Sequence, residues 1–146
     1  MRRQLPFTCI GACLLLLAPS VLFGQFPNSV ICQFERIATA ELDANGKIAS
    51  GADKDTGELV ISDLNTERPL ASGNIGSVKL EVLRRSESAI WLAVHRDDSL
   101  LSEGSGVVTL FSKSRVVMYT KHEILHTVSG DTPFGFVEIG KFRPLK

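Results

Sequence analysis

Short runs in which apolar and polar residues alternate recur along most of this chain. Val78, Leu80 and Val82 alternate with Lys79 and Glu81, which is the period of a strand with one buried face. β-Branched and aromatic residues are common in the runs, as the pleated surface of a sheet favours. The pattern therefore predicts an all-β protein.

The apolar runs define six expected strands and two hairpins. The run 89–94 is apolar on both faces and suits a central strand. In the last run, Phe134, Phe136 and Phe142 share one face, with Val137 and Ile139 on the other. We expect hairpins between 78–83 and 90–94 and between 107–111 and 115–120. The expected strands are 59–61, 78–83, 89–94, 107–111, 116–120 and 134–142.

Clusters of turn-forming residues separate the runs. Within one of them, Asp53-x-Asp55-x-Gly57 lacks the remaining ligands of a calcium loop, so a plain turn is the better interpretation. Short strands with frequent turns predict a small antiparallel β-sandwich or barrel, and do not distinguish between the two. The clusters lie at 43–46, 53–57, 72–74, 102–106 and 129–131.

Residues 30–42 fit two interpretations. Phe34, Ile37, Ala38 and Leu42 fall on one face of a helix, and Ser29 suits its N-cap. The β pattern of the rest of the chain favours a strand instead. The strand is slightly preferred.

The first 24 residues have the composition of a secretory signal peptide. Arg2 and Arg3 precede an apolar run over 9–23, which is shorter than the roughly 20 residues that a membrane span needs. Cleavage is expected after Gly24, or alternatively after Ser20. Residues 25–146 then form a single β-rich domain, secreted or periplasmic, with no membrane span in the mature chain.

Charge and cysteine content narrow the functional classes. Sixteen Lys and Arg balance sixteen Asp and Glu, so the chain lacks the basic surplus of a nucleic-acid binder. Cys9 and Cys13 are removed with the signal peptide, which leaves Cys32 without a partner for an internal disulfide. Between Val30-Ile31 and Phe34, Cys32 is expected to be a buried, inert thiol.

One motif suggests catalysis. His122-Glu123-Ile124-Leu125-His126 resembles the H-E-x-x-H signature of zincin metallopeptidases. The resemblance implies a helix, zinc bound by His122 and His126, and Glu123 as the general base. It covers these five residues and nothing else in the chain.

The surrounding composition supports a different geometry for this motif. Seven of the thirteen residues from Val116 to Val128 are β-branched or tyrosine, which favours a strand. At about 3.3 Å per residue, His122 and His126 would then be roughly 13 Å apart, too far to share one zinc ion. The secondary structure at residue 122 therefore separates the two interpretations.

The remaining sequence favours binding over catalysis. We expect a non-enzymatic exported β-domain without a cofactor, which binds an unknown protein or small ligand or serves a structural role. A small zinc-dependent peptidase that uses His122, Glu123 and His126 is the alternative. If the domain is a hollow barrel, its ligand cavity is expected to involve Trp91, Phe111 and Phe136.

Overall fold

The computed structural model describes residues 26–42, 47–73, 76–95, 102–127 and 130–146. Within these residues the chain forms strands and no helix, as the alternating pattern predicts. The nine strands are β1 (Val30–Leu42), β2 (Ile48–Lys54), β3 (Glu58–Ser62), β4 (Leu70–Gly73), β5 (Gly76–Arg85), β6 (Ala89–His95), β7 (Ser102–Phe111), β8 (Val116–Thr127) and β9 (Gly130–Pro144).

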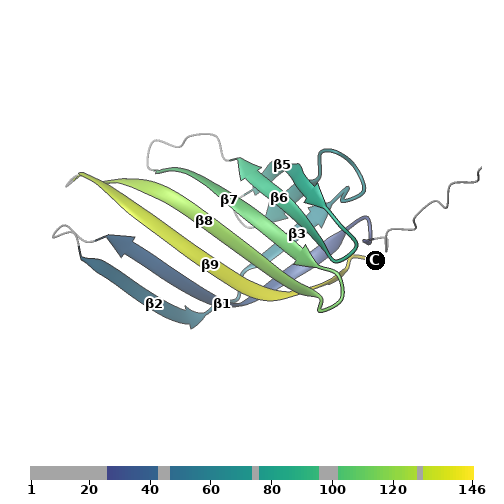
Figure 1. The fold of residues 1–146 in the computed structure, drawn as a ribbon, viewed down its shortest axis with the longest axis horizontal. Helices are drawn as coiled ribbons and strands as arrows, with labels where there is room; N and C mark the ends of the chain where they lie inside the picture. The colour runs from purple at the N-terminus through teal and green to yellow at the C-terminus, as the bar shows by residue number, and fades with distance from the viewer. Residues whose placement is uncertain (1–25, 43–46, 74–75, 96–101, 128–129) are drawn as a thin grey trace, which may run out of the picture.

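Eight of these strands close into an antiparallel barrel. From β3 to β9 each strand pairs with the next along the chain, while β1 pairs with both β3 and β9. Of the two architectures that the sequence left open, the fold is therefore the barrel. Figure 1 shows that β7, β8, β9, β1 and β2 extend together beyond β3, β5 and β6.

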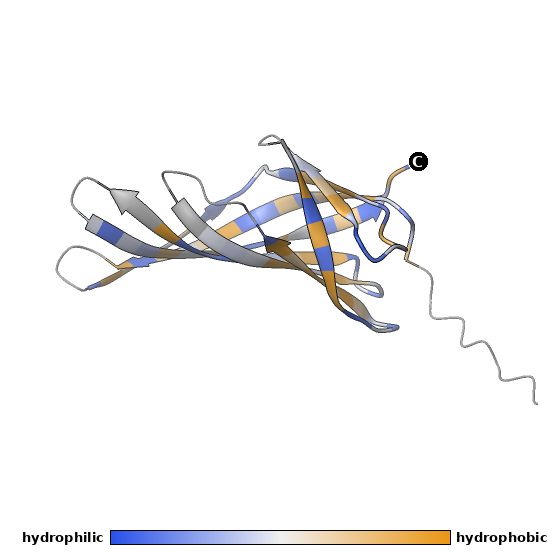
Figure 2. Ribbon diagram, turned by 90° about the horizontal axis from the view of Figure 1, so that it is seen from above, coloured by the Kyte–Doolittle hydropathy of each residue, from blue (hydrophilic) through white to orange (hydrophobic). Residues whose placement is uncertain are grey.

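Alternate side chains of the strands fill the barrel. On β9, Phe142 is buried between the exposed Lys141 and Arg143, and it stacks on Phe26 with ring centroids 6.4 Å apart. Figure 2 shows the matching alternation of hydrophobic and hydrophilic residues along strands. The buried core comprises Phe26, Val30, Cys32, Phe34, Ile61, Leu64, Ala71, Leu80, Ile90, Leu92, Val94, Val108, Leu110, Val117 and Phe142.

A β-bulge in β1 separates the closed barrel from the extension. The pairing of β1 with β9 shifts between Phe34 and Arg36, so Glu35 is the extra residue. Before the bulge β1 pairs with β3, and after it β1 pairs with β2 on the same side. The second half of β1 thus leaves the closed barrel and continues in the extended part of the sheet.

Close approach of β1 and β9 at this bulge requires a glycine. A Cβ atom on Gly140 would overlap the carbonyl oxygen of Gln33 and lie 2.6 Å from the Cα atom of Phe34. Real side chains do not tolerate such distances to backbone atoms. Gly140 therefore allows the barrel to close where β1 bends.

The structure confirms most of the expected strands. It adds the strands β2 and β4, and it replaces one expected turn with a strand. Residues 30–42 form a strand, and both expected hairpins are present. The short strands β2 and β4 did not stand out, because small residues such as Ala49, Gly51 and Ala71 weaken the alternation. The expected turn at 102–106 is wrong, since these residues form the start of β7.

Two glycines explain why the stretch 102–106 forms part of a strand. A Cβ atom on Gly104 would lie 2.7 Å from Cγ of Glu123, and one on Gly106 would lie 2.6 Å from the ring of Tyr119. These glycines therefore leave space for large side chains of β8, and they do not mark a turn.

The expected signal peptide, residues 1–24, lies outside the described residues.

The buried thiol is present as expected. Cys32 is fully buried in the core and forms no disulfide within the described residues. Burial raises the pKa of the thiol to about 12, because a thiolate is poorly solvated there. In the part of the chain that the structure describes, we find no helix long and apolar enough to span a membrane.

Candidate functional site

The motif that resembles a zinc signature lies in strand β8. His122 is opposite Gly135 of β9, and His126 is opposite Asp131, in an unbroken antiparallel register. The backbone positions of His122 and His126 are therefore about 13 Å apart along the strand. The helical arrangement in which both histidines would bind one zinc ion is therefore absent at this position.

The side chains of this motif also alternate between the two faces of the sheet. His122 is exposed on the outer face, whereas Glu123 points inward beside Gly104. A glutamate on the opposite face is not placed to activate a water bound at His122. Among the described residues, no group of three or more His, Cys, Asp and Glu side chains is arranged to hold a metal ion.

His122 instead lies in an apolar groove on the outer face of the extension. The groove has a volume of about 920 Å³ and crosses β7, β8, β9 and β1 to the first residue of β2. A Cβ atom on Gly135 would lie 3.6 Å from Nδ1 of His122, so both residues face the groove side. Its lining consists of Ala38, Thr39, Ala40, Glu41, Leu42, Ile48, Gly104, Ser105, Thr120, His122, Glu123, Ile124, Pro133, Phe134, Gly135, Phe136 and Val137.

Small residues in the centre and larger apolar residues around them give the groove its shape. Ala40 of β1 lies opposite Gly135 of β9, so little side-chain volume projects from the middle of the sheet. Leu42, Ile48 and Ile124 surround this floor and are 37%, 71% and 42% exposed. Because large side chains of this kind are normally buried, their exposure together around one groove is informative.

The opposite, inner face of the same strands carries a buried ion pair. Lys121 and Glu123, two residues apart on β8, form a salt bridge with side chains only 8% and 12% exposed. The Lys121 ammonium also lies 5.9 Å from the ring centroid of Phe136, which stacks edge-on with Tyr119. Both charges are therefore compensated where the apolar core ends.

A pair of carboxyl groups lies next to this ion pair. Asp55, in the connection between β2 and β3, accepts a hydrogen bond at Oδ1 from the backbone N–H of Gly57 at 2.8 Å. Its Oδ2 is buried and finds no fixed donor in the described part of the chain. The Glu138 side chain lies against the Asp55 side chain, and the two can share a hydrogen bond when one of the two carboxyls is protonated.

The surroundings determine which carboxyl holds this proton. The pKa of Glu138 is raised to about 7, mainly because the side chain is buried and also because of the nearby Asp55, while Lys121 acts in the opposite direction. Glu138 therefore carries the proton below neutral pH. The proton allows the side chains of Glu138 on β9 and Asp55 in the β2–β3 connection to interact favourably.

The three aromatic residues expected to line a cavity are not brought together. Phe136 faces inward against Tyr119 and also borders the groove. Trp91 and Phe111 directly follow the buried residues Ile90 and Leu110 in their strands. Their side chains therefore lie on the outer face. The guanidinium of Arg84 covers the Trp91 ring at 5.6 Å.

The interior polar groups lie apart in the sequence and do not form a recognisable motif. Lys121 and Glu123 lie an even number of positions after the buried Val117, so their side chains point inward. Glu138 lies four positions before the buried Phe142 and points inward for the same reason. A charged residue at an inward position is the signal that identifies them. The involvement of Asp55 depends on the bend between β2 and β3, which the sequence pattern does not specify.

No protein-family model, curated protein or solved structure matches this chain. The groove and the groups beneath it are therefore the features that bear on function.

Proposed function

We propose that this protein is an exported binding module, and that its ligand is a small, elongated apolar molecule held in the outer groove. The observation that carries this proposal is the exposure of Leu42, Ile48 and Ile124 around a groove of about 920 Å³. That volume falls within the range of about 300–1,000 Å³ of small-molecule sites. A protein partner is less well supported, since protein interfaces are usually flatter and larger.

Polar groups in the groove would orient such a ligand. His122, Ser105 and Thr120 line the wall formed by β7 and β8, opposite the apolar side chains of β1. A ligand with one hydrogen-bonding end and an apolar body therefore complements the groove best. Burial of its apolar body provides most of the affinity, at roughly 25 cal/mol per Å² of apolar surface.

Binding of a neutral fluorescent probe, N-phenyl-1-naphthylamine, tests the proposal. Its fluorescence should rise saturably with the wild-type protein. The variant Ala40→Trp places an indole ring on the groove floor and should weaken probe binding by roughly tenfold or more, because the probe loses its buried surface.

Lys79→Trp is the matched control for this substitution. Lys79 is exposed on β5, which contributes no residue to the groove, so this variant should bind the probe like the wild type. Circular dichroism verifies that both variants remain folded. Equal binding by the Ala40→Trp variant, or no saturable binding by the wild type, contradicts the proposal.

Export has its own test. The arginines followed by a short apolar run support cleavage after Gly24 and release of the domain outside the cytoplasm. Expression of the full chain followed by mass spectrometry of the extracytoplasmic fraction should show a product beginning at Gln25. A product that retains Met1, or one found only in the cytoplasm, contradicts this expectation.

A further inference from the structure

The outer edge of β2 is the feature that neither the barrel nor the groove accounts for. Of the strands in the described residues, β2 alone has a single neighbour, β1, while the barrel closes through β3 and β4. All seven of its residues are exposed. Its backbone N–H and C=O groups on the far side are thus available to pair with another strand.

The composition of β2 leaves this edge unprotected. Proteins usually block exposed edges with charged side chains, proline or β-bulges. The middle of β2 is Ala49-Ser50-Gly51-Ala52, which contains none of these. Its pairing with β1 runs from Ile48 to Lys54 without a register shift, so the edge is also regular.

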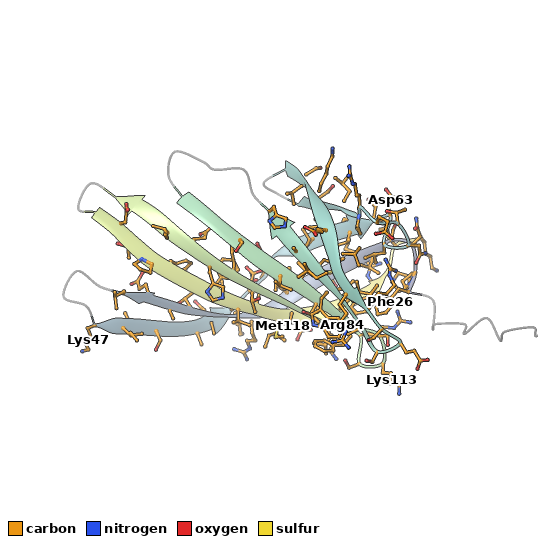
Figure 3. The ribbon with its side chains drawn as sticks, turned by 45° about the horizontal axis from the view of Figure 1, so that its top comes forward. Phe26, Lys47, Asp63, Arg84, Lys113 and Met118 are labelled. Carbon is orange, nitrogen blue, oxygen red and sulfur yellow. The ribbon has the colours of Figure 1, made fainter. Side chains whose placement is uncertain are left out.

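The charges at the two ends of β2 are complementary under a two-fold axis. When a second β2 pairs antiparallel about Ser50, Lys47 of each copy lies opposite Asp53 of the other. Positions 47 and 53 are separated by an even number of residues, so both side chains are on one face and the pair forms twice. Figure 3 shows Lys47 at the tip of the extension, away from the closed barrel.

We propose that the β2 edge joins two copies of this chain into a symmetric dimer, in which the two extensions form one continuous sheet. A two-fold axis requires each surface patch to complement itself, and the Lys47–Asp53 pairing meets this requirement. Antiparallel pairing of seven residues supplies backbone hydrogen bonds, and the small central side chains permit close approach. Formation of the dimer does not require a ligand, although Ile48 belongs to both β2 and the groove.

Charge reversal at the two ends of β2 tests this dimer. Sedimentation velocity of the purified protein, made with its own leader, should show a concentration-dependent dimer. Lys47→Asp and Asp53→Lys should each weaken dimerisation by roughly tenfold, because each creates two like-charge pairs. The double variant Lys47→Asp/Asp53→Lys should restore it, as should an equimolar mixture of the two single variants.

A third substitution tests the register without altering the ion pairs. Ser50→Lys places two ammonium groups opposite each other on the two-fold axis and should abolish the dimer. The control variant Lys113→Glu lies in an exposed turn far from β2 and should have no effect on the dimer. Circular dichroism verifies folding of every variant. A monomer at all concentrations, or a dimer that is indifferent to Ser50→Lys and to both charge reversals, overturns the proposal.

Discussion

Glu138 of β9 and Asp55 of the β2–β3 connection form a pair of neighbouring carboxyl groups next to the buried Lys121–Glu123 ion pair. A hydrogen bond between them exists only while one carboxyl is protonated, and the pKa of Glu138 is raised to about 7 by burial and by Asp55. The contact between β9 and the connection that joins β2 to β3 therefore depends on pH.

This pair predicts that stability falls as pH rises towards neutrality. Between the ordinary pKa of 4.5 and about 7, the folded state holds a proton on Glu138 that the unfolded state has lost. Stability from this group is therefore complete below about 4.5 and is lost as pH rises through about 7. Urea unfolding across this range should show the decrease.

The variant Glu138→Gln isolates this effect. A neutral amide donates a hydrogen bond to Asp55 at every pH, so the decrease between pH 4.5 and 7 should largely disappear. The variant should be more stable than the wild type above pH 7. An unchanged pH profile in Glu138→Gln would show that the carboxyl pair is not responsible.

Gly140 gives a second prediction. Gly140→Ala forces a Cβ atom against the backbone of Gln33 and Phe34, which should destabilise the fold by about 1–3 kcal/mol or more. Gly135→Ala on the same strand is the matched control, because its Cβ atom would lie 3.5 Å from the nearest atom and should change stability by under about 0.5 kcal/mol. Equal unfolding midpoints for the two variants would contradict the close-approach argument.

The buried ion pair gives a third prediction. Lys121→Ala leaves the carboxylate of Glu123 buried without its partner and should cost about 3–5 kcal/mol of unfolding free energy. Replacing both residues in Lys121→Met/Glu123→Met should cost much less, since no unpaired charge remains. A double variant as unstable as the single one would show that the pair acts through packing rather than charge.

Cys32 gives a fourth prediction, on reactivity. Its pKa of about 12 and full burial leave almost no accessible thiolate at pH 8, so Cys32 should react with a disulfide reagent only as the protein unfolds. Addition of denaturant should make the reaction fast. Ser114→Cys in a Cys32→Ala background provides an exposed control that should react immediately, and equally fast labelling of native Cys32 would contradict the burial.

Much of the barrel could be predicted from the sequence, because side-chain alternation is a local property of a strand. The runs around Val78 and Phe142 have the required period of two, the run around Ile90 is apolar on both faces as in a central strand, and short turns make neighbouring runs pair as hairpins. The same alternation places Glu123 and His122 of the zinc-like motif on opposite faces. The alternation does not reveal the strand role of Gly104 and Gly106, because glycines also mark turns.

The sequence by itself thus determined the all-β class, the hairpins and the buried position of Cys32, since each depends on residues close together in the chain. Only the tertiary structure decided that the sheet closes between β1 and β9, that Ala40 and Gly135 meet on a groove floor, and that Asp55 reaches Glu138. These contacts join residues more than eighty positions apart. Such pairing depends on strand register, the bulge at Glu35 and the clearance at Gly140, which no local pattern records.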